Sequence, residues 1–455
     1  MLPHKALARW TDASLSRHAL EASSRRGKLM RIELEHGTLP EQGWDEATVQ
    51  AFLLELSALD SNNFAHHAGA GEREGRVYSR MVAQRHFGLA HGVGRSGDVA
   101  ATQPKAAGSS TMVKLTQSMA RDAIRRICNV RALEHVIVLP VATGMALTLC
   151  FLAVKTGPRA VWTRMDQKTC VKALALAGCD VVVVDNVVEG DAVRCDVRAV
   201  AAAMDAGQVG LVVSTTSGFA PRVPDDVVAI ALLCKERGVP HVINNAYGLQ
   251  CSKCCHLVQE ACRVGRVDAV VQSTDKNFLV PVGGALVASP SAAVVDKVSK
   301  LYPGRASAAP CMDLFLTLLA MGADGLSSLL KQRAALSQGA FNDMLRRVAE
   351  RNGERVLETK GNTISFAVTL SGGRDAAHLT EFGSMLFTRG VSGARVVPRG
   401  VRQEVSSLPF AGFGSSCSAY PHDYFTVACA IGMTRAEVDL VEQRLNACFE
   451  EWRRR

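Results

Sequence analysis

The stretch HVIVLPVATGMALTLCFLAVKTG at residues 135–157 decides the fold of this chain. It begins with a short apolar run of strand length, and after a proline it continues as an apolar segment that favours a helix. The same alternation of strand and helix continues to residue 289. Further strand-like segments are AVWTRMD (160–166), DVVVVDNV (180–187), GLVVSTTS (210–217), VPHVINNA (239–246), VDAVVQST (267–274) and VGGALVAS (282–289). Continuous apolar strands that alternate with helices predict an α/β fold, in which helices flank a mostly parallel central sheet.

Changes in composition along the chain predict three domains. Residues 1–40 are basic and favour a helix, so we predict a helical N-terminal arm. Its charges either form a solvated face or contact another subunit or RNA, and we expect a role in oligomerisation. Residues 41–305 form a large domain that contains the sheet. Beyond it the pattern changes to long helices with a few strands, so residues 306–455 are predicted to form a smaller α+β C-terminal domain.

The composition excludes several classes of protein. Hydrophobic residues make up 48% and charged residues 21% of the 455 residues, which is typical of folded rather than disordered chains. We find no apolar run of transmembrane length, and the N-terminal MLPHKALARW lacks the apolar segment of a secretion signal. We therefore expect a cytoplasmic protein with no membrane partner. The net charge of +9 is compatible with a polyanionic partner but is weak evidence for one.

The 14 cysteines are scattered, and most lie in apolar stretches. Without a secretion signal, buried reduced thiols are the expected state. One cluster, Cys251-Ser-Lys-Cys254-Cys255-His256, contains a C-x-x-C pair followed by histidine, which can bind zinc. A structural zinc site needs a second ligand pair at a fixed distance, and none is evident. We therefore predict no metal site.

Polar residues follow three predicted strands, at the carboxyl ends where parallel sheets bind ligands. Lys276 follows VDAVVQST in an apolar setting, which favours a neutral and nucleophilic amine. Ala142, Thr143 and Gly144 open a helix after the first strand, and backbone N–H groups there can seat a phosphate. Asn244 occupies the place where pyridoxal phosphate (PLP) enzymes of fold type I usually carry an aspartate for the ring nitrogen. Together these features predict a PLP site, although Lys276 taken alone is also compatible with a surface loop.

A glycine-rich loop, HGVGRSGD at residues 91–98, is a second candidate site. No clear strand precedes it and no helix follows directly, so a dinucleotide site is a poor interpretation. Its glycines free backbone N–H groups, and nearby side chains that can donate hydrogen bonds to an anion are Arg95, Ser96, Gln103 and Lys105. We predict a second phosphate site there, and an ordinary glycine-rich connection is the alternative.

Long blocks of the sequence resemble one enzyme family. The blocks are GEREGRV (71–77), HGVGRSGDVAATQPKAAGSS (91–110), PVATGM (140–145), STTSGFAPRVPD (214–225), NNAYGLQCSKC (244–254), GRVDAVVQSTDKNFLVPVGGA (265–285), YPGRAS (302–307) and FGSMLFTRGVSGARVVP (382–398). They resemble the O-phosphoseryl-tRNA(Sec) selenium transferases, the selenocysteine synthases of eukaryotes and archaea. The resemblance implies a homotetrameric PLP-dependent enzyme of fold type I. Such an enzyme converts O-phosphoseryl-tRNA(Sec) to selenocysteinyl-tRNA(Sec) with selenophosphate.

The resemblance also implies roles for single residues. It places the lysine that binds PLP at Lys276, with Arg73 beside the cofactor, and it includes an asparagine at the position of Asn244. It places the substrate-phosphate loop at residues 94–105, with Ser96 and Gln103 as contacts and Arg305 as a further phosphate-binding arginine. Arg263 and Arg395 match positions that contact tRNA. The enrichment in cysteine at 251–255 is not a pattern associated with that family, and the chain stops soon after its last predicted helix.

Two other functions are compatible with parts of this pattern. One is a PLP lyase or desulfurase that acts on free amino acids, which does not explain the second phosphate loop together with a basic arm. The other is a catalytically idle tRNA-binding scaffold, which predicts a broken cofactor site. The presence of Lys276, Asn244 and Thr143 argues against that second alternative.

Overall fold

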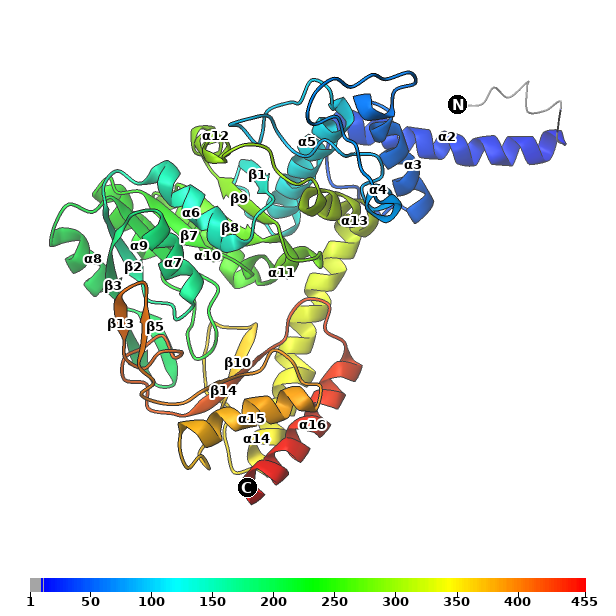
Figure 1. Ribbon diagram of the computed structural model, residues 1–455. Helices are drawn as coiled ribbons and strands as arrows, with labels where there is room; N and C mark the ends of the chain where they lie inside the picture. Colours follow the sequence, from blue (N-terminus) through cyan, green and yellow to red (C-terminus); the bar gives the residue numbers. More distant parts are fainter. Residues whose placement is uncertain (1–9, 11) are drawn as a thin grey trace.

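A seven-stranded sheet forms the centre of the computed structural model, which describes residue 10 and residues 12–455 (Figure 1). Its strand order is β1-β9-β8-β7-β6-β2-β3. Strands β2, β3, β6, β7 and β8 pair in parallel, and β9 runs antiparallel between β1 and β8. The strands span His135–Leu139 (β1), Arg159–Thr163 (β2), Asp180–Val184 (β3), Leu211–Thr215 (β6), His241–Asn244 (β7), Ala269–Ser273 (β8) and Ala285–Ser289 (β9). The predicted α/β fold with a mostly parallel sheet is confirmed.

Helices cover both faces of the sheet, which explains why its central strands are apolar throughout. Every residue of β6, β8 and β9 is buried, so these strands show no alternation of polar and apolar residues. The surrounding helices are Thr143–Val154 (α6), Lys168–Leu176 (α7), Val197–Asp205 (α8), Val227–Glu236 (α9), Ser252–Val264 (α10) and Ala292–Leu301 (α12). Burial of each Val or Ile side chain in this layer stabilises the fold by about 1.5–3 kcal/mol.

The strand directions bring the predicted site segments to one edge of the sheet. Because β9 is antiparallel to both of its neighbours, β1 points the same way as the parallel strands. The carboxyl ends of β1, β7 and β8 therefore meet at the same edge, where helix α6 and the short helix Thr274–Phe278 (α11) begin. This is the edge at which parallel sheets bind ligands.

The long helix α13 (Ala309–Leu336) connects the region of the large sheet to a second, smaller layer (Figure 1). That layer has a three-stranded antiparallel sheet of order β10-β14-β11, and its core packs against helices α14, α15 and α16. Its elements span Asn342–Arg351 (α14), Ser365–Thr369 (β10), Ala376–Thr388 (α15), Arg395–Val397 (β11), Tyr424–Ala428 (β14) and Arg435–Arg454 (α16). The domain boundaries at residues 40 and 305 stay predictions.

Two buried charges connect the large sheet to the segment between β11 and β14. The Arg164 side chain donates to both carboxylate oxygens of Asp166 and to the carbonyl oxygen of Ala411 at 2.7 Å. Asp166 in turn accepts from the backbone N–H groups of Gly414 (2.7 Å) and Ser416 (2.8 Å). Because the paired charges also satisfy backbone groups, the segment is held against the carboxyl edge of the sheet. Two hairpins complete the strands, Asn186–Glu189 (β4) with Ala192–Cys195 (β5), and Gln403–Val405 (β12) with Leu408–Phe410 (β13).

The N-terminal part of the chain is helical and lies beside α13. Helix α2 (Ala13–His36) projects from the rest of the molecule (Figure 1), and α3 (Glu46–Ser57), α4 (Arg80–Arg85) and α5 (Ala107–Asp122) follow it. Residues 1–9 and 11 of the predicted arm lie outside the described residues. The backbone passes close to α13 at Gly322, where a Cβ atom would lie 2.5 Å from the N atom of Gly43. Gly322 has a φ of 61°, which glycine adopts without strain.

One helical stretch, Ala309–Arg351, is long and apolar enough to cross a membrane by length and composition alone. Helices in the cores of other folds pass the same test. In this chain α13 contributes Leu314, Phe315 and Leu318 to the main core, where α13 packs against α5 and α3.

Candidate active site

Lys276 lies on helix α11, directly after strand β8, and two amide side chains hold the backbone of this turn. Asn277 donates from Nδ2 to the carbonyl oxygen of Ser273 at 2.7 Å. Gln250 donates from Nε2 to the carbonyl oxygen of Lys276 at 2.5 Å. Gln250 also accepts, at Oε1, from the backbone N–H of Ile431 at 2.7 Å. The lysine is therefore positioned from the sheet and from the C-terminal part of the chain together.

The Lys276 side chain lines a cavity of 240 Å³, which we call the lysine cavity. Its walls come from the carboxyl edge of the large sheet and from the C-terminal layer. Apolar and aromatic lining residues include Met165, Phe219, Tyr247, Leu279, Ile364 and Ile431. Polar lining residues include Gln167, Ser217 and Asp275.

One polar atom of the lysine cavity has no partner. The Tyr247 hydroxyl is buried and makes no hydrogen bond within the described part of the chain. Burial also raises the pKa of this hydroxyl, so it stays protonated at neutral pH. A buried hydroxyl without a partner costs about 1–3 kcal/mol. It therefore marks a position that a polar atom of a bound ligand would satisfy.

The predicted phosphate seat lies at the start of helix α6. Ala142 precedes the helix without any side-chain cap, so the first backbone N–H groups remain open to an anion. A Cβ atom at Gly144 would lie 2.5 Å from Cγ2 of Thr169, so only glycine permits this close approach. Asn244 is 2% exposed at the end of β7, where its Oδ1 accepts from the N–H of Ala246 at 3.2 Å.

These residues fit PLP, although they do not all line one cavity. Open N–H groups at α6 suit a phosphate, and the unpartnered Tyr247 hydroxyl suits a polar ring substituent. Thr143 and Asn244 do not line the lysine cavity, but their strands end at the same edge of the sheet as the strand before Lys276. The predicted cofactor roles of these residues and of Arg73 stay predictions.

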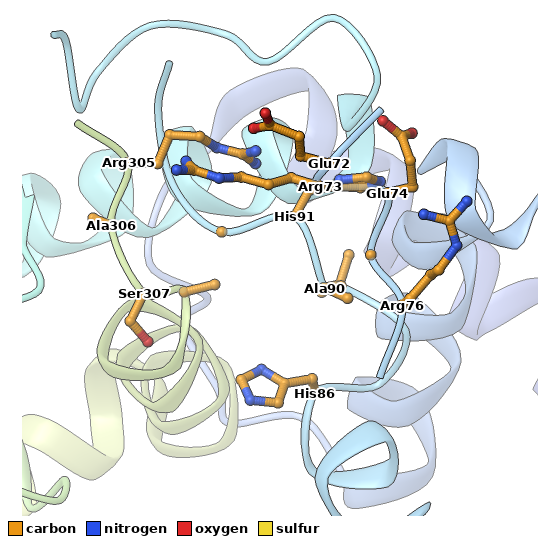
Figure 2. A pocket seen from close by; sticks show the side chains of 14 residues that line it. Glu72, Arg73, Glu74, Arg76, His86, Ala90, His91, Arg305, Ala306 and Ser307 are labelled. Carbon is orange, nitrogen blue, oxygen red and sulfur yellow. The ribbon is translucent and has the colours of Figure 1, made fainter. Parts of the chain in front are cut away.

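Arg73 and Arg305 line a second cavity, of 440 Å³, which we call the cation cavity. Figure 2 shows their guanidinium groups close together, Arg305 on the segment before α13 and Arg73 on a loop of the N-terminal part. Both Nε and Nη2 of Arg305 are buried without a hydrogen-bond partner, and no ion pair of Arg305 occurs among residues 12–455. Burial and the charge of Arg73 lower the pKa of Arg305. Glu72 and Glu74 also line the cavity, and the charge of Glu74 partly opposes the effect of Arg73 on the pKa of Arg305. The unpartnered nitrogens of Arg305 beside a second guanidinium group nevertheless favour binding of an anion.

Two further groups shape the electrostatics of the cation cavity. Lys105 donates from Nζ to Oε1 of Glu74 at 2.8 Å and to the carbonyl oxygen of Arg73 at 2.6 Å. The hydrogen bond to Glu74 lowers the pKa of that carboxyl group, and the hydrogen bond to Arg73 places Lys105 against the loop that carries this arginine. His91 has a buried Nδ1 without a partner, and burial lowers its pKa. His91 is therefore neutral at pH 7 in the free protein.

The glycine-rich loop forms a tight turn beside this cavity. Backbone hydrogen bonds join Arg95 and Asp98 in both directions, at 2.9 and 2.8 Å, and the side chains of Arg95 and Ser96 are exposed at the turn. Gly94 has a φ of 73°, and a Cβ atom there would lie 2.5 Å from Cα of Val99. Gln103 is half-buried where the loop leads into α5. The loop therefore presents its predicted phosphate ligands to solvent.

The lysine cavity and the cation cavity share no lining residue. The structure thus brings the predicted phosphate arginine Arg305 together with Arg73, and it brings neither of them to Lys276 within one chain. The two arginines predicted to contact tRNA also lie apart. Arg263 is exposed on α10 and pairs with Glu260 at 2.7 Å. Arg395 lies over the ring of Phe219, with its Cζ 5.7 Å from the ring centroid, at the wall of the lysine cavity.

Several residues of these cavities were not predicted as site residues. Tyr247 and Gln250 lie in the block 244–254 that resembles the family, but their local sequence pattern does not distinguish a residue of a cavity wall from a residue of the core. Ile364 and Ile431 come from the C-terminal layer, and only long-range packing brings them to Lys276. His91 begins the glycine-rich loop, and its position next to a predicted anion site was the available signal.

Comparisons with known proteins agree with this geometry. Residues 59–450 match the family O-phosphoseryl-tRNA(Sec) selenium transferase. The relative of that name from Dictyostelium discoideum is 43% identical, over 95% of this chain and 96% of the relative. The relative of that name from Methanopyrus kandleri is 38% identical, over 96% of this chain and 98% of the relative.

Solved structures show the same fold. The crystal structure of an archaeal O-phosphoseryl-tRNA(Sec) selenium transferase is 29% identical, with a TM-score of 0.87, and covers 96% of this chain and 98% of its own. Sphingosine-1-phosphate lyase of Burkholderia pseudomallei, 15% identical, has a TM-score of 0.57 and covers 96% of this chain and 91% of its own, which shows a common fold only. The chain thus has the fold of type I PLP-dependent enzymes. Since the family match extends over residues 59–450 and the relatives match along nearly their whole length, this chain belongs to the O-phosphoseryl-tRNA(Sec) selenium transferase family.

Proposed function

We propose that this protein converts O-phosphoseryl-tRNA(Sec) to selenocysteinyl-tRNA(Sec), with selenophosphate as selenium donor and PLP as cofactor. The observation that carries the proposal is a cation cavity with two guanidinium groups, in which two buried nitrogens of Arg305 lack partners, in a chain that also holds a lysine cavity at the sheet edge. A lyase that acts on amino acids without a phosphate has no use for the cation cavity. Family membership supports the same reaction.

In the proposed reaction the lysine cavity carries out proton transfer and the cation cavity binds phosphate. Lys276, Asn244 and the open N–H groups at the start of α6 would hold PLP at the sheet edge, where it would supply an acceptor for the electron pair that remains when a proton leaves Cα of the substrate. The Lys276 amine removes this Cα proton, and it returns a proton to Cα after selenium has added. As the Cβ–O bond breaks, phosphate leaves with the bonding electrons and dehydroalanyl-tRNA forms. Arg305 and Arg73 bind the phosphate and stabilise its growing negative charge.

Selenium is transferred after phosphate has left. The selenium of selenophosphate adds to Cβ of the dehydroalanyl group, and water cleaves the phosphorus–selenium bond to release phosphate and selenocysteinyl-tRNA. Asn244 carries no charge, so it does not hold a proton on the pyridine nitrogen as an aspartate would. We propose that this weaker electron withdrawal is sufficient because phosphate is a good leaving group.

We further propose that one active site combines the lysine cavity of one subunit with the cation cavity of another. Within a single chain the two cavities share no lining residue, yet the proposed reaction needs a base at Cα and a phosphate ligand at Cβ at the same time. Two-fold pairing of identical chains creates two equivalent composite sites. A homotetramer contains such pairs, and the projecting helix α2 is the proposed additional contact.

The tRNA partner is supported by the basic charge outside the cavities. Arg263 is exposed, and Arg395 lies at the wall of the lysine cavity, where the acceptor end of a tRNA must enter. Binding through phosphates releases counterions, so tRNA affinity should fall steeply as salt rises, whereas salt-independent binding would contradict this partner. Because charged tRNA is used in the cytoplasm, we propose a cytoplasmic location, which imaging of a fluorescent fusion would test.

The proposed function is tested by incubation of the purified, PLP-loaded protein with selenophosphate and either O-phosphoseryl-tRNA(Sec) or free O-phosphoserine. We expect selenocysteine on the recovered tRNA, detected by mass spectrometry after deacylation, and no turnover of the free amino acid. Turnover of free phosphoserine or cysteine without tRNA would support a lyase or desulfurase instead. A purified protein that never shows PLP absorbance would support an idle scaffold.

A further inference from the structure

A pair of cysteines lies at the start of helix α10, next to the lysine cavity, and the proposed reaction does not use it. Cys251 is the residue before the helix begins at Ser252, and Cys254 lies in the first turn. The spacing C-x-x-C therefore places both thiols at the positive end of the helix dipole, where a thiolate is stabilised. Both residues are nearly fully buried, at 2% and 3% exposure.

The surroundings of the two thiols make them unequal. Cys251 shares a hydrogen bond with Thr363, with 3.3 Å between Sγ and Oγ1. The Cys254 thiol donates to the carbonyl oxygen of Thr216 at 3.6 Å. Interaction with the Cys254 side chain lowers the pKa of Cys251 to about 5, and Thr363 and the backbone N–H groups of Cys254 and Lys253 add to this effect against burial. The same contact with Cys251, followed by burial, raises the pKa of Cys254. One thiol is thus poised as a nucleophile and its neighbour as a protonated thiol.

A buried arginine beside the pair independently indicates a negative charge there. Arg333 on α13 is 4% exposed and donates from Nη1 to the carbonyl oxygen of Thr363 at 2.9 Å, while its Nε has no partner. Among residues 12–455 no carboxylate forms an ion pair with Arg333, and its charge reaches Cys254. A buried cation without a counter-charge is costly, and a thiolate within this cysteine pair would compensate it.

The residue next to Cys251 in the chain borders a cavity, although neither thiol of the pair lines it. A cavity of 380 Å³ lies between α10 and α13, and its lining includes Ser252, Cys255 and Arg333. Ser252 follows Cys251 directly in the chain. Zinc is a poor alternative occupant, because no group of three or more metal-binding side chains gathers anywhere in the described residues.

We propose that Cys251 and Cys254 form a redox-active dithiol, which small hydroperoxides convert to an intramolecular disulfide. The Cys251 thiolate attacks one peroxide oxygen, the O–O bond breaks, and the second oxygen leaves as hydroxide, so Cys251 becomes a sulfenic acid. The Cys254 sulfur then attacks the Cys251 sulfur, the S–O bond breaks, and the proton of Cys254 and the hydroxyl leave as water. The dithiol loses two electrons, the peroxide gains them, and a thiol reductant restores the pair.

The dithiol contacts the walls of the lysine cavity. Cys251 and Cys254 pack with Ile364 and Tyr247, and both of these residues line that cavity. Closure of a disulfide draws the two sulfurs together and shifts this packing, so oxidation is coupled to the shape of the cavity that holds Lys276.

The test is limited oxidation of the reduced full-length protein with hydrogen peroxide, followed by alkylation of free thiols under denaturing conditions, trypsin digestion and mass spectrometry. Trypsin cleaves after Lys253, so the disulfide appears as two peptides joined through Cys251 and Cys254. We expect this pair to form before any other disulfide.

The pH dependence of the oxidation rate is the second readout. An ordinary thiol loses about tenfold in reactivity for each pH unit below its pKa, so between about pH 8 and pH 6 the oxidation of other cysteines should slow about a hundredfold. The groups around Cys251 include Cys254, Thr363 and Tyr247 and the backbone of Lys253, and the rate of Cys251 should change less than threefold over that range.

Two variants keep the proposal falsifiable without reference to selenium transfer. Cys254→Ser should abolish the disulfide and leave a sulfenic acid at Cys251 that dimedone traps, whereas Cys448→Ser, in the C-terminal core, should leave the disulfide unchanged. Prior formation of another disulfide, such as one between Cys128 and Cys255, would overturn the proposal. A rate for Cys251 that falls with pH like that of the other thiols would also overturn it. Neither result bears on the proposed transferase activity, which is measured separately.

Discussion

The lysine cavity and the cation cavity differ in how their polar groups are satisfied. Around Lys276, the amide side chains of Asn277 and Gln250 donate to the carbonyl oxygens of Ser273 and Lys276, and the carboxyl edge of the sheet supplies the frame. Around Arg305, loops from distant parts of the chain hold two guanidinium groups near each other, and two nitrogen atoms of Arg305 remain without partners. In the first cavity the uncharged Tyr247 hydroxyl is left without a partner. The second is energetically incomplete until an anion enters it, which is the physical sign of a substrate site.

The largest expected effect is on the lysine cavity. Lys276→Ala removes the amine that the proposed reaction requires at Cα, so we expect selenocysteinyl-tRNA formation to fall by at least about a thousandfold. The absorbance of bound PLP should also disappear. Lys300→Ala, which removes a surface lysine paired with Asp296, is the matched control and should leave both readouts unchanged. Retained activity of Lys276→Ala would break the assignment of this cavity to catalysis.

A smaller effect of a different kind is expected from the cation cavity. Arg305→Ala should lower kcat/KM for O-phosphoseryl-tRNA by about a hundredfold, since one charged ligand of the leaving phosphate is lost. The PLP absorbance should stay as in the unchanged protein. Because the variant also relieves repulsion from Arg73 and removes unpartnered nitrogens, we expect Tm to rise by about 1–2 °C.

The control for this variant is Arg346→Ala, which removes an exposed arginine that pairs with Glu358. It should change neither kcat/KM nor the absorbance. Loss of PLP absorbance in Arg305→Ala would contradict the proposal that the cation cavity binds phosphate and has no role in binding PLP.

Asn244→Asp tests whether the neutral residue at the sheet edge limits the rate of elimination. A carboxylate at this buried position would hold a proton on a bound pyridine nitrogen and strengthen its electron withdrawal. We expect the PLP absorption maximum to shift and phosphate elimination to speed up by about tenfold. Unchanged kinetics together with an unchanged spectrum would remove the proposed role of a neutral residue at 244.

The smallest expected effect is the pH dependence of anion binding. Sulfate keeps its charge between about pH 6 and pH 8, so it reports on the protein alone. Burial holds the pKa of His91 below its usual value, and an anion in the cation cavity raises that pKa again. Binding therefore takes up a proton, and sulfate affinity, measured by calorimetry, should increase about threefold as pH falls across this range. His91→Gln should abolish the change, and stronger binding at the higher pH would contradict it.

The fold and the separate motifs were predictable from the sequence, but their assembly was not. Continuous apolar strands separated by short helices indicated the parallel sheet. Strands that are buried on both faces lack the alternation of polar and apolar residues that is typical of a half-exposed antiparallel sheet. Lys276, Asn244 and Thr143 were identified because each directly follows a strand. By contrast, Tyr247, Gln250 and the C-terminal residues at the lysine cavity depend on contacts across the chain, which no local pattern encodes.

The glycine-rich loop shows the same limit. Its residue types predicted an anion site near Arg95 and Lys105, and the structure places an unpartnered pair of arginines close by. The ion pair of Lys105 with Glu74 was not predictable, because Glu74 is distant in the chain and becomes a neighbour only in the fold.

Mixing of two inactive variants tests most directly whether the two cavities work together across subunits. Lys276→Ala and Arg305→Ala chains, co-expressed in equal amounts with different tags and purified as mixed oligomers, are assayed for selenocysteinyl-tRNA formation. In a mixed pair, one composite site combines the intact lysine cavity of one chain with the intact cation cavity of the other. With random pairing we predict about a quarter of the activity of the unchanged protein. Activity no higher than that of Arg305→Ala alone would contradict a composite site.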